Sequence, residues 1–491
     1  MFTAASLSFL PHLIRLALPI ALQALMMTVL NLVDTVMVGQ LGEVQIGAIA
    51  LGNQIFFLLM LFLFGVGSGG AVFASQYWGR RDVHGVRRSM AIALIVGVAG
   101  ATLFTLVGEL IPRTLLSLFS SDGAVLDEGT GYLRIVALSY IFTAVSISYA
   151  HGLRSIGDTR LPMYATAVSI VLNIVGNYAL IFGAFGFPAL GVRGAAISTA
   201  IARLVEVAII LTVVYRRNGP TAVRGADFRS LDRAFATAYF NRALPVIVNE
   251  ILWSTGFVLY TVVFGRMGTS FLAAYNISDT VGRLMLVFFI GTGNATAVLI
   301  GNMIGAGRSE EAEQVGKTIL RLAPIVSGVV GIVVFFVVAP LVPYLFSVSP
   351  EVRRLVTQFQ QMFAILIVAK AMNIHVIVGI LRGGGDTRYA LAIDILPLWF
   401  IGVPAAFIAG LVLAVPAPMV YLALNMEEIT RAIIGWRRVN SGVWVNDLVG
   451  EGSGTFPDRF EPVPGYETTD IPPAFDDSDA TGDARGGHPS P

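Results

Sequence analysis

Residues 153–160 read LRSIGDTR, and residues 381–388 read LRGGGDTR, 228 positions further along the chain. A second pair of stretches has nearly the same separation: RLALPIALQ at 15–23 and NRALPVIVN at 241–249 lie 226 positions apart. Two separate matches at almost one offset indicate that the second half of the chain repeats the first. We therefore predict a fold built from two similar halves.

Single Pro and Gly residues also recur at the offset of 226. Both residue types have unusual backbone conformations. Six such matches without a gap are hard to obtain by chance. The pairs are Pro19 with Pro245, Gly39 with Gly265, Gly42 with Gly268, Gly65 with Gly291, Gly67 with Gly293, and Gly79 with Gly305.

The composition indicates a membrane protein. Of the 491 residues, 55% are hydrophobic and 13% are charged, whereas about a quarter of the residues in a soluble domain are charged. The chain has no Cys and only five His, which excludes disulfides, thiolate metal sites and Cys nucleophiles. We expect a polytopic membrane protein without a cofactor.

A membrane-spanning helix needs about 20 apolar residues, and the sequence holds twelve such stretches. The first is too long for the apolar core of a signal peptide, so we interpret it as a retained helix. The predicted fold is an all-α integral membrane protein with helices at 12–38, 45–75, 88–112, 130–152, 161–184, 192–215, 243–265, 271–304, 315–345, 354–381, 389–413 and 417–437.

Each half contributes six of these helices, and an even number gives both halves the same orientation in the membrane. They are then related by a pseudo-two-fold axis along the membrane normal. We predict an N-lobe at 1–215, an inter-lobe loop at 216–241, a C-lobe at 242–437 and a tail at 438–491. The tail is rich in Pro, Gly and Asp, which predicts a disordered acidic segment.

Alternate loops are basic, such as the loop with Arg80 and Arg81 and the inter-lobe loop from Arg216 to Arg242. By the positive-inside rule these loops are cytoplasmic, which places both termini inside the cell. The acidic tail also fits a high-salt cytoplasm. We expect a prokaryotic, multi-pass protein of the cytoplasmic membrane, with a haloarchaeon as a candidate source.

The repeat, DTVMVG at 34–39, the two GDTR stretches, WGRRD at 78–82 and IGAGR at 304–308 resemble the multidrug and toxic compound extrusion (MATE) family, closest to its DinF-like branch. The resemblance covers about residues 10–437. It implies a V-shaped fold of twelve helices. We expect a monomer that is not an enzyme and binds no nucleic acid. Such an antiporter lies among membrane lipids and exports small organic, often cationic and lipophilic, compounds in exchange for H⁺ or Na⁺.

The resemblance also implies a cation-coupling site in the first lobe, at Asp34 and Asn173. Many archaeal relatives carry a second Asp where this chain has Asn177, so a single carboxylate remains. Asn173 and Asn177, four residues apart, share one helix face. We rank coupling to H⁺ through Asp34 first. Coupling to Na⁺, bound by the oxygens of Asp34, Asn173 and Asn177, ranks second. In a purely structural alternative, the two Asn side chains only form hydrogen bonds with each other and with nearby backbone. Further candidates for this cluster are Tyr132, Ser198 and Thr199.

In the second lobe, Glu250 matches a Glu that helps to bind the coupling ion in the NorM-type branch. The partner Asp of that branch is replaced by Ala371, with Lys370 beside it. We therefore predict a structural ion pair between Glu250 and Lys370, because pairing lowers the cost of burying both charges. Asn373 and His375 complete this polar site, His375 either as a proton relay or as a hydrogen-bonded residue of the bundle.

Two further pairs, Arg203 with Glu206 and Asp279 with Arg283, have helical spacing and are predicted to be structural. Two other functions stay open. A lipid-linked oligosaccharide flippase of the same superfamily would need several cationic residues in its cavity for the pyrophosphate. An integral-membrane enzyme would need a nucleophile with a base, or a metal cluster, at membrane depth, and the sequence suggests neither.

Overall fold

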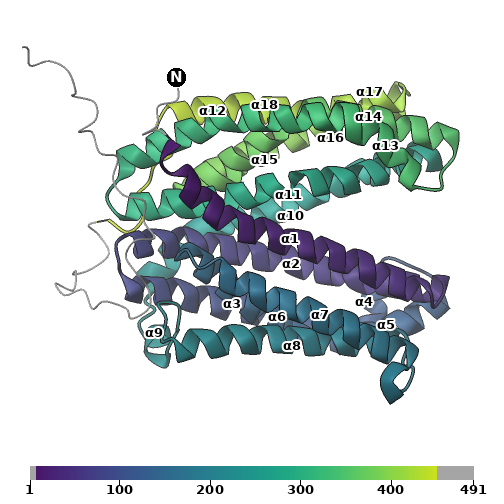
Figure 1. Cartoon of the computed structure of the whole chain (residues 1–491), viewed down its shortest axis with the longest axis horizontal. Helices are drawn as coiled ribbons and strands as arrows, with labels where there is room; N and C mark the ends of the chain where they lie inside the picture. The colour runs from purple at the N-terminus through teal and green to yellow at the C-terminus, as the bar shows by residue number, and fades with distance from the viewer. Residues whose placement is uncertain (1–6, 451–491) are drawn as a thin grey trace, which may run out of the picture.

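The structure is a computed structural model that describes residues 7–450, and these residues form helices in two bundles (Figure 1). The first bundle is the N-lobe and the second is the C-lobe. The N-lobe consists of α1 (Leu10–Gly39), α2 (Glu43–Gly79), α3 (Val83–Leu110), α4 (Pro112–Ser117), α5 (Gly123–Ala137), α6 (Ser139–Ser155), α7 (Arg160–Phe182) and α8 (Val192–Arg216). A short helix, α9 (Gly225–Arg229), lies in the loop that leads to the C-lobe.

The C-lobe repeats this order, with π-helical turns inside several of its helices. It consists of α10 (Arg233–Met267), α11 (Thr269–Gly305), α12 (Ser309–Val333) with α13 (Ala339–Leu341), α14 (Pro350–Asn373) with its π-helical extension Ile374–Leu381, α15 (Thr387–Pro397) with α16 (Val403–Phe407), α17 (Ala417–Leu424) and α18 (Met426–Asn440).

Ten helices of the described chain are long and apolar enough to cross a membrane. An eleventh crossing combines α5 and α6, which meet at a bend of 47°. The predicted twelfth crossing corresponds to α17 and α18. It differs from the others because α18 buries three charged residues, Glu427, Glu428 and Arg431.

Two of the repeated glycine pairs, Gly65 with Gly291 and Gly79 with Gly305, lie where helices of the two lobes cross. A Cβ atom on Gly65 of α2 would lie 2.7 Å from Cα of Ile247 on α10. At the equivalent crossing, a Cβ atom on Gly291 of α11 would lie 2.8 Å from Cβ of Ala21 on α1. Only glycine lets two backbones approach this closely. The first helix of each lobe therefore packs against the second helix of the other lobe.

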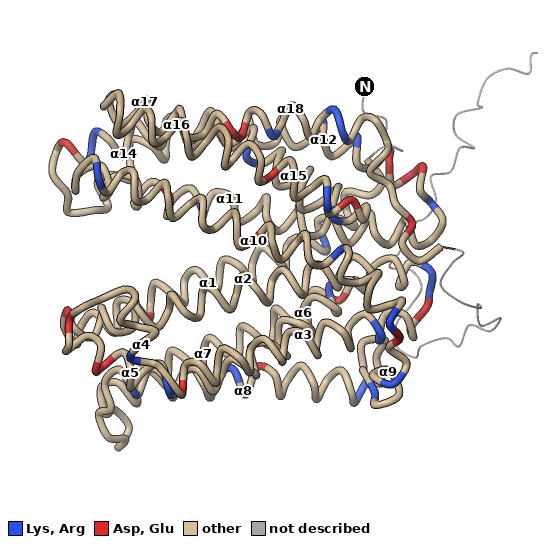
Figure 2. The backbone as a smooth tube through the Cα atoms, turned by 180° about the vertical axis from the view of Figure 1, so that it is seen from behind, with Lys and Arg blue, Asp and Glu red and all other residues tan. Residues whose placement is uncertain are grey.

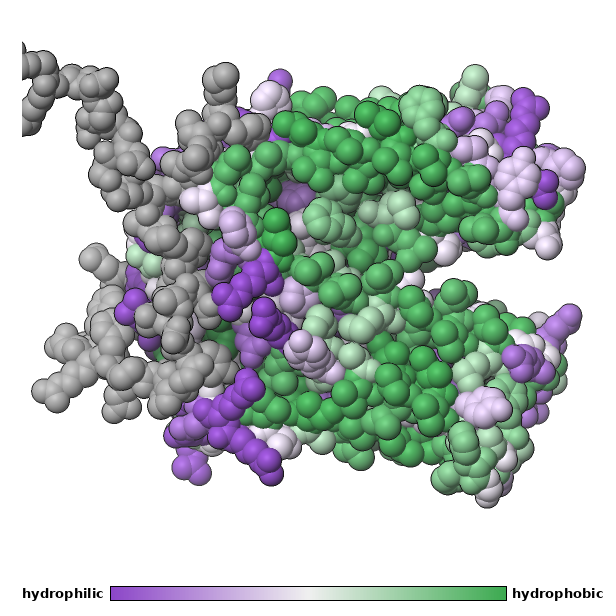
Figure 3. Space-filling view, in the orientation of Figure 1, coloured by the Kyte–Doolittle hydropathy of each residue, from purple (hydrophilic) through white to green (hydrophobic). Residues whose placement is uncertain are grey.

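The two lobes meet at one end of the molecule and separate at the other. A Cβ atom on Gly79 of α2 would collide with the carbonyl oxygen of Asn302 on α11, and one on Gly305 would collide with that of Gln76. This tight end carries α9, and Figure 3 shows a gap between the lobes at the opposite end. The structure is a V that is closed at the α9 end.

The surface agrees with a membrane protein. Hydrophobic side chains cover the middle of both lobes, and polar ones gather toward the two ends (Figure 3). Lys and Arg gather at the α9 end (Figure 2), which we call the basic end. If this end is cytoplasmic, as predicted from the sequence, the V opens to the outside.

The predicted disordered tail at 438–491 is wrong for its first residues. Helix α18 continues to Asn440, and residues 441–450 pack against both lobes. The reason is two apolar side chains, Trp444 and Val449, which are fully buried and stabilise an ordered backbone by removing apolar surface from water. The rest of the predicted tail, 451–491, lies outside the described residues.

Candidate functional site

Asp34 lies half-buried in α1 and faces the amides of α7. Nδ2 of Asn177 donates to Oδ1 of Asp34 at 2.7 Å and to Oδ1 of Asn173 at 3.1 Å. Asn173 in turn donates to the hydroxyl of Thr199 on α8 at 3.2 Å. The structure therefore brings together the four side chains of a cluster that lie far apart in the sequence.

The two other candidates for this cluster have different partners. The hydroxyl of Ser198 donates to the backbone carbonyl of Asn173 at 2.9 Å, so it fixes α8 against α7 rather than facing Asp34. The hydroxyl of Tyr132 is directed to Oδ1 of Asn53, at the long distance of 3.5 Å. Neither side chain has a hydrogen bond to Asp34 within the described chain.

A second polar chain ties the basic half of α1 to the N-lobe. Gln23 of α1 accepts from Arg154 of α6 at 2.6 Å and donates to Thr166 of α7 at 2.8 Å. Thr166 donates to Glu206 of α8 at 2.7 Å, and Arg203 pairs with Glu206 at 2.8 Å. The predicted Arg203–Glu206 pair is confirmed, and it ends a network that spans four helices.

Helix α1 is thus held from two sides. Side-chain hydrogen bonds at Asp34 and Gln23 attach it to the N-lobe, while Ala17 and Ala21 pack on Gly291 of the C-lobe. Pro19 lies inside the helix between these contacts and removes one backbone hydrogen bond, which allows a bend there. A change at Asp34 can therefore alter how α1 lies between the lobes.

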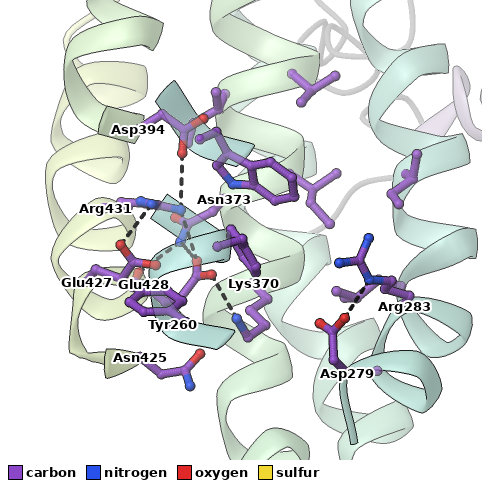
Figure 4. Close-up of a pocket in the computed structure, with 18 of the residues that line it drawn as sticks. Tyr260, Asp279, Arg283, Lys370, Asn373, Asp394, Asn425, Glu427, Glu428 and Arg431 are labelled. Atoms are coloured by element: carbon purple, nitrogen blue, oxygen red, sulfur yellow. Dashed lines mark hydrogen bonds and ion pairs between the residues drawn. The ribbon is translucent and has the colours of Figure 1, made fainter. Parts of the chain in front are cut away.

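A cavity of about 330 Å³ lies in the C-lobe, with Phe64 of α2 at its N-lobe side. Helices α10, α11, α14, α15, α17 and α18 of the C-lobe contribute side chains to it (Figure 4). Its lining includes five carboxylates and four cationic groups, so its formal charge is −1. Seven aromatic side chains complete the wall, namely Phe64, Trp253, Phe257, Tyr260, Tyr275, Phe363 and Tyr421.

Most of the charged groups in this cavity are paired. Lys370 contacts Glu428 at 2.9 Å, and Asn373 donates to the other oxygen of Glu428 at 2.7 Å. Arg431 contacts Asp394 at 3.1 Å and Glu427 at 2.9 Å, as the dashed lines in Figure 4 show. The network joins α14, α15 and α18 by interactions between buried charges.

The predicted pair between Glu250 and Lys370 is wrong. Glu250 contacts Arg382 at 2.9 Å, and Lys370 contacts Glu428 instead. The physical reason is that α18 brings a second buried carboxylate next to Lys370, while the π-helical extension of α14 places Arg382 beside α10. Both charges are compensated as expected, but by other partners.

His375 lies outside the charged network. Its Nε2 atom contacts the hydroxyl of Thr292 at 2.9 Å, and its Nδ1 atom contacts the carbonyl oxygen of Ala371 at 2.7 Å. Both ring nitrogens therefore have partners between α14 and α11, as in the hydrogen-bonded alternative. The Asp279–Arg283 pair is confirmed at 2.7 Å and lies at the wall of the cavity.

Sequence reasoning missed five charged residues of the cavity wall, namely Arg382, Asp394, Glu427, Glu428 and Arg431. Arg382 directly follows the predicted helix 354–381, so the sequence places it in a loop. A signal for α18 is present in MEEITRAIIGWRR at 426–438, where Glu427 and Arg431 are four residues apart on a helix face. In an otherwise apolar crossing, such charges indicate a polar bundle interior.

Comparison with known proteins identifies the family. The MatE family model matches residues 19–179 and 245–408, one match in each lobe. The chain belongs to the MatE family. Its members are transporters, and the two matches reproduce the internal repeat of the sequence.

Two curated MatE relatives illustrate the similarity. The uncharacterized transporter YisQ of Bacillus subtilis is 24% identical over 436 residues, covering 88% of this chain and 94% of YisQ. A probable multidrug resistance protein NorM of Thermotoga maritima is 27% identical over 411 residues, covering 81% and 85%. The bent form of the Vibrio cholerae MATE transporter VcmN has the same fold, with a TM-score of 0.81 at 20% identity over 90% and 98% of the two chains.

Proposed function

We propose that this MATE transporter is a secondary antiporter of the DinF-like branch that exports organic cationic and lipophilic compounds, driven by H⁺ through Asp34. It acts as a monomer in the cytoplasmic membrane, with both termini inside. The single observation that carries the proposal is the half-buried carboxylate of Asp34, whose hydrogen-bond partner, Asn177, is neutral.

The hydrogen-bond geometry favours H⁺ over Na⁺ at this site. A sodium ion needs several oxygen atoms directed at one point. Here the amide nitrogen of Asn177, a donor, stands between Oδ1 of Asp34 and Oδ1 of Asn173. A proton requires no such arrangement, since it binds to the carboxylate alone.

Protonation of Asp34 would act through α1. It removes the negative charge that accepts the hydrogen bond from Asn177, and charge-assisted hydrogen bonds are stronger than neutral ones. The contact between α1 and α7 weakens, while the contacts of Ala17 and Ala21 with α11 persist. Helix α1 then moves or bends at Pro19, and the cavities beside it change shape. Ion and substrate thereby favour different conformations, as antiport requires.

The C-lobe cavity supports a cationic organic substrate. Its aromatic walls attract a cation through their π-faces, and its formal charge is negative because five carboxylates face four cationic groups. The same balance disfavours the flippase alternative, since a pyrophosphate group needs an excess of positive charge. Each of the four cationic groups in this wall contacts a carboxylate.

The test is transport of a fluorescent organic cation in proteoliposomes, with a pH gradient and a Na⁺ gradient imposed separately. The unmodified chain should export the cation under the pH gradient alone. Asp34→Asn, which imitates the protonated state and cannot release a proton, should fold and bind substrate but fail to transport under either gradient.

Glu43→Gln is the matched control, because Glu43 is an exposed carboxylate at the start of α2 and its loss also removes one negative charge. This variant should transport normally. Full gradient-driven export by Asp34→Asn would show that coupling takes place elsewhere. Transport by the unmodified chain under the Na⁺ gradient alone would favour sodium coupling.

A further inference from the structure

The two arginines of the repeated LRxxGDTR motif meet in one small pocket between the lobes. Arg154 is the first arginine of the first copy and Arg382 is the first arginine of the second copy, and both line a pocket of about 30 Å³. Six further lining residues are also related by the repeat, because Ser68, Ala71 and Val72 of α2 correspond to Asn294, Ala297 and Val298 of α11 at an offset of 226. The pocket therefore lies on the pseudo-two-fold axis.

The positive charge in this pocket exceeds the negative charge. Nη2 of Arg382 contacts Glu250 at 2.9 Å, but its Nη1 atom is buried without a hydrogen-bond partner in the described chain. Arg154 donates to the neutral side chain of Gln23, and its buried Nε atom likewise has no partner among residues 7–450. The carboxylate of Glu206 forms its ion pair with Arg203.

A buried charge without a counterion is strongly destabilising, and a buried donor without an acceptor adds to that cost. We propose that a small monovalent anion of the size of chloride binds on the pseudo-two-fold axis between Arg154 and Arg382. The volume of about 30 Å³ exceeds the roughly 10–15 Å³ that one water-sized sphere needs, so a monatomic anion fits.

An anion at this place connects the two lobes. It contacts one arginine of each lobe and lies beside α2 and α11, the helices whose backbones meet at the basic end. Opening of the basic end separates these helices and therefore the two guanidinium groups. The anion thus stabilises the conformation that is closed at the basic end.

The first test is crystallographic, with bromide in place of chloride. An anomalous bromide peak between Arg154 and Arg382 is expected. A pocket that contains only water in bromide crystals would overturn the proposal.

The second test compares thermal unfolding in chloride and in gluconate at equal ionic strength and pH. Chloride should raise the unfolding temperature in a saturable manner, since a ligand of the folded state stabilises it by mass action. Arg154→Gln should abolish the rise. Arg160→Gln, a change of an exposed arginine in the same motif, should retain it. An equal unfolding temperature of the unmodified chain in both salts would also contradict the proposal.

A separate observation at the same end concerns residues 441–450, which we call the strap. Trp444 is fully buried in the C-lobe core, where its ring lies against Gly316 and Gly384, and the backbone N–H of Asn446 donates to the carbonyl oxygen of Gly384 at 2.9 Å. Five residues after Trp444, Val449 is fully buried in the N-lobe core. The strap therefore crosses from one lobe to the other.

The N-lobe receives the strap at the end of α2. The side chain of Gln76 accepts from the N–H of Leu448 at 2.8 Å and donates to the carbonyl oxygen of Asn446 at 3.0 Å. Arg80 contacts Asp447 at 2.9 Å. These contacts bridge the site where the lobes must separate in the opposite conformation. We infer that the strap is a clasp, which holds the basic end closed and leaves its N-lobe site when that end opens.

The chain contains no Cys, so two spin labels can be placed without other changes, for example at the exposed positions Arg217 and Glu310 of the two lobes. A chain truncated after Gly450 keeps the strap and should give the inter-lobe distances of the full chain. Gln76→Ala, which removes two strap hydrogen bonds, should increase the population with a longer distance. An unchanged distance distribution in Gln76→Ala and in a chain truncated after Asn440 would refute the clasp.

Discussion

The corrected pairing of buried charges in the C-lobe can be tested by exchanging partners. Lys370→Met leaves Glu428 without its cation at 2.9 Å, and only Arg431 at 3.9 Å and the amide of Asn373 remain near it. Removal of one partner from a buried ion pair costs about 3 to 5 kcal/mol. Because two weaker partners remain, we expect the lower end of this range, about 3 kcal/mol.

The double variant Lys370→Met with Glu428→Gln removes both charges and should recover most of this loss. Glu250→Gln with Lys370→Met, the pair predicted from the sequence, should show no recovery. This double variant leaves both Arg382 and Glu428 without their ion-pair partners. Because the two ion pairs share no residue in the described chain, the losses in unfolding free energy should add.

The assay is equilibrium unfolding in mixed detergent micelles, with the two double-mutant cycles measured side by side. The structure predicts a coupling energy of about 2 kcal/mol or more between Lys370 and Glu428, since close charge pairs in contact commonly couple by about 0.5–3 kcal/mol. It predicts a coupling near zero between Lys370 and Glu250. A larger coupling energy for Glu250 with Lys370 than for Glu428 with Lys370 would refute the reasoning.

Other predictions concern the contacts between helices. Gly305→Val forces α11 away from α2 at the basic end, so it should lower both export and the unfolding temperature. In the control Gly328→Val, no atom lies within 4 Å of the added carbon. This control should have little effect on export or on the unfolding temperature. Gln23→Leu removes the hydrogen-bond partner of Arg154 and should destabilise the chain by about 1.5 to 3 kcal/mol; unchanged stability in micelle unfolding would speak against this role. Trp444→Ala should cost about 3 to 5 kcal/mol, and Trp436→Ala, which alters an exposed side chain, less than 1 kcal/mol.

The sequence alone determined the architecture, and the physical reason is that a bilayer leaves few choices. Each crossing must satisfy its own backbone hydrogen bonds, so apolar stretches of sufficient length become helices. The offset of 226 then predicted two lobes, and two of its glycine pairs, Gly65 with Gly291 and Gly79 with Gly305, lie at equivalent inter-lobe crossings. Local spacing also predicted the Arg203–Glu206 and Asp279–Arg283 pairs, because partners three or four residues apart meet on one helix face.

Only the tertiary structure decided which distant charges meet. Lys370 lies 58 residues from Glu428, and Arg382 lies 132 from Glu250. Pairing at such separations depends on how helices are rotated and where π-helical turns shift their faces, which no local pattern encodes. The same holds for the strap, since the burial of Trp444 and Val449 depends on two separate cores. Residues 441–450 read SGVWVNDLVG, and these apolar residues were masked by the Pro-, Gly- and Asp-rich composition of the longer predicted tail. Each of the two gains stability only from the lobe that receives it.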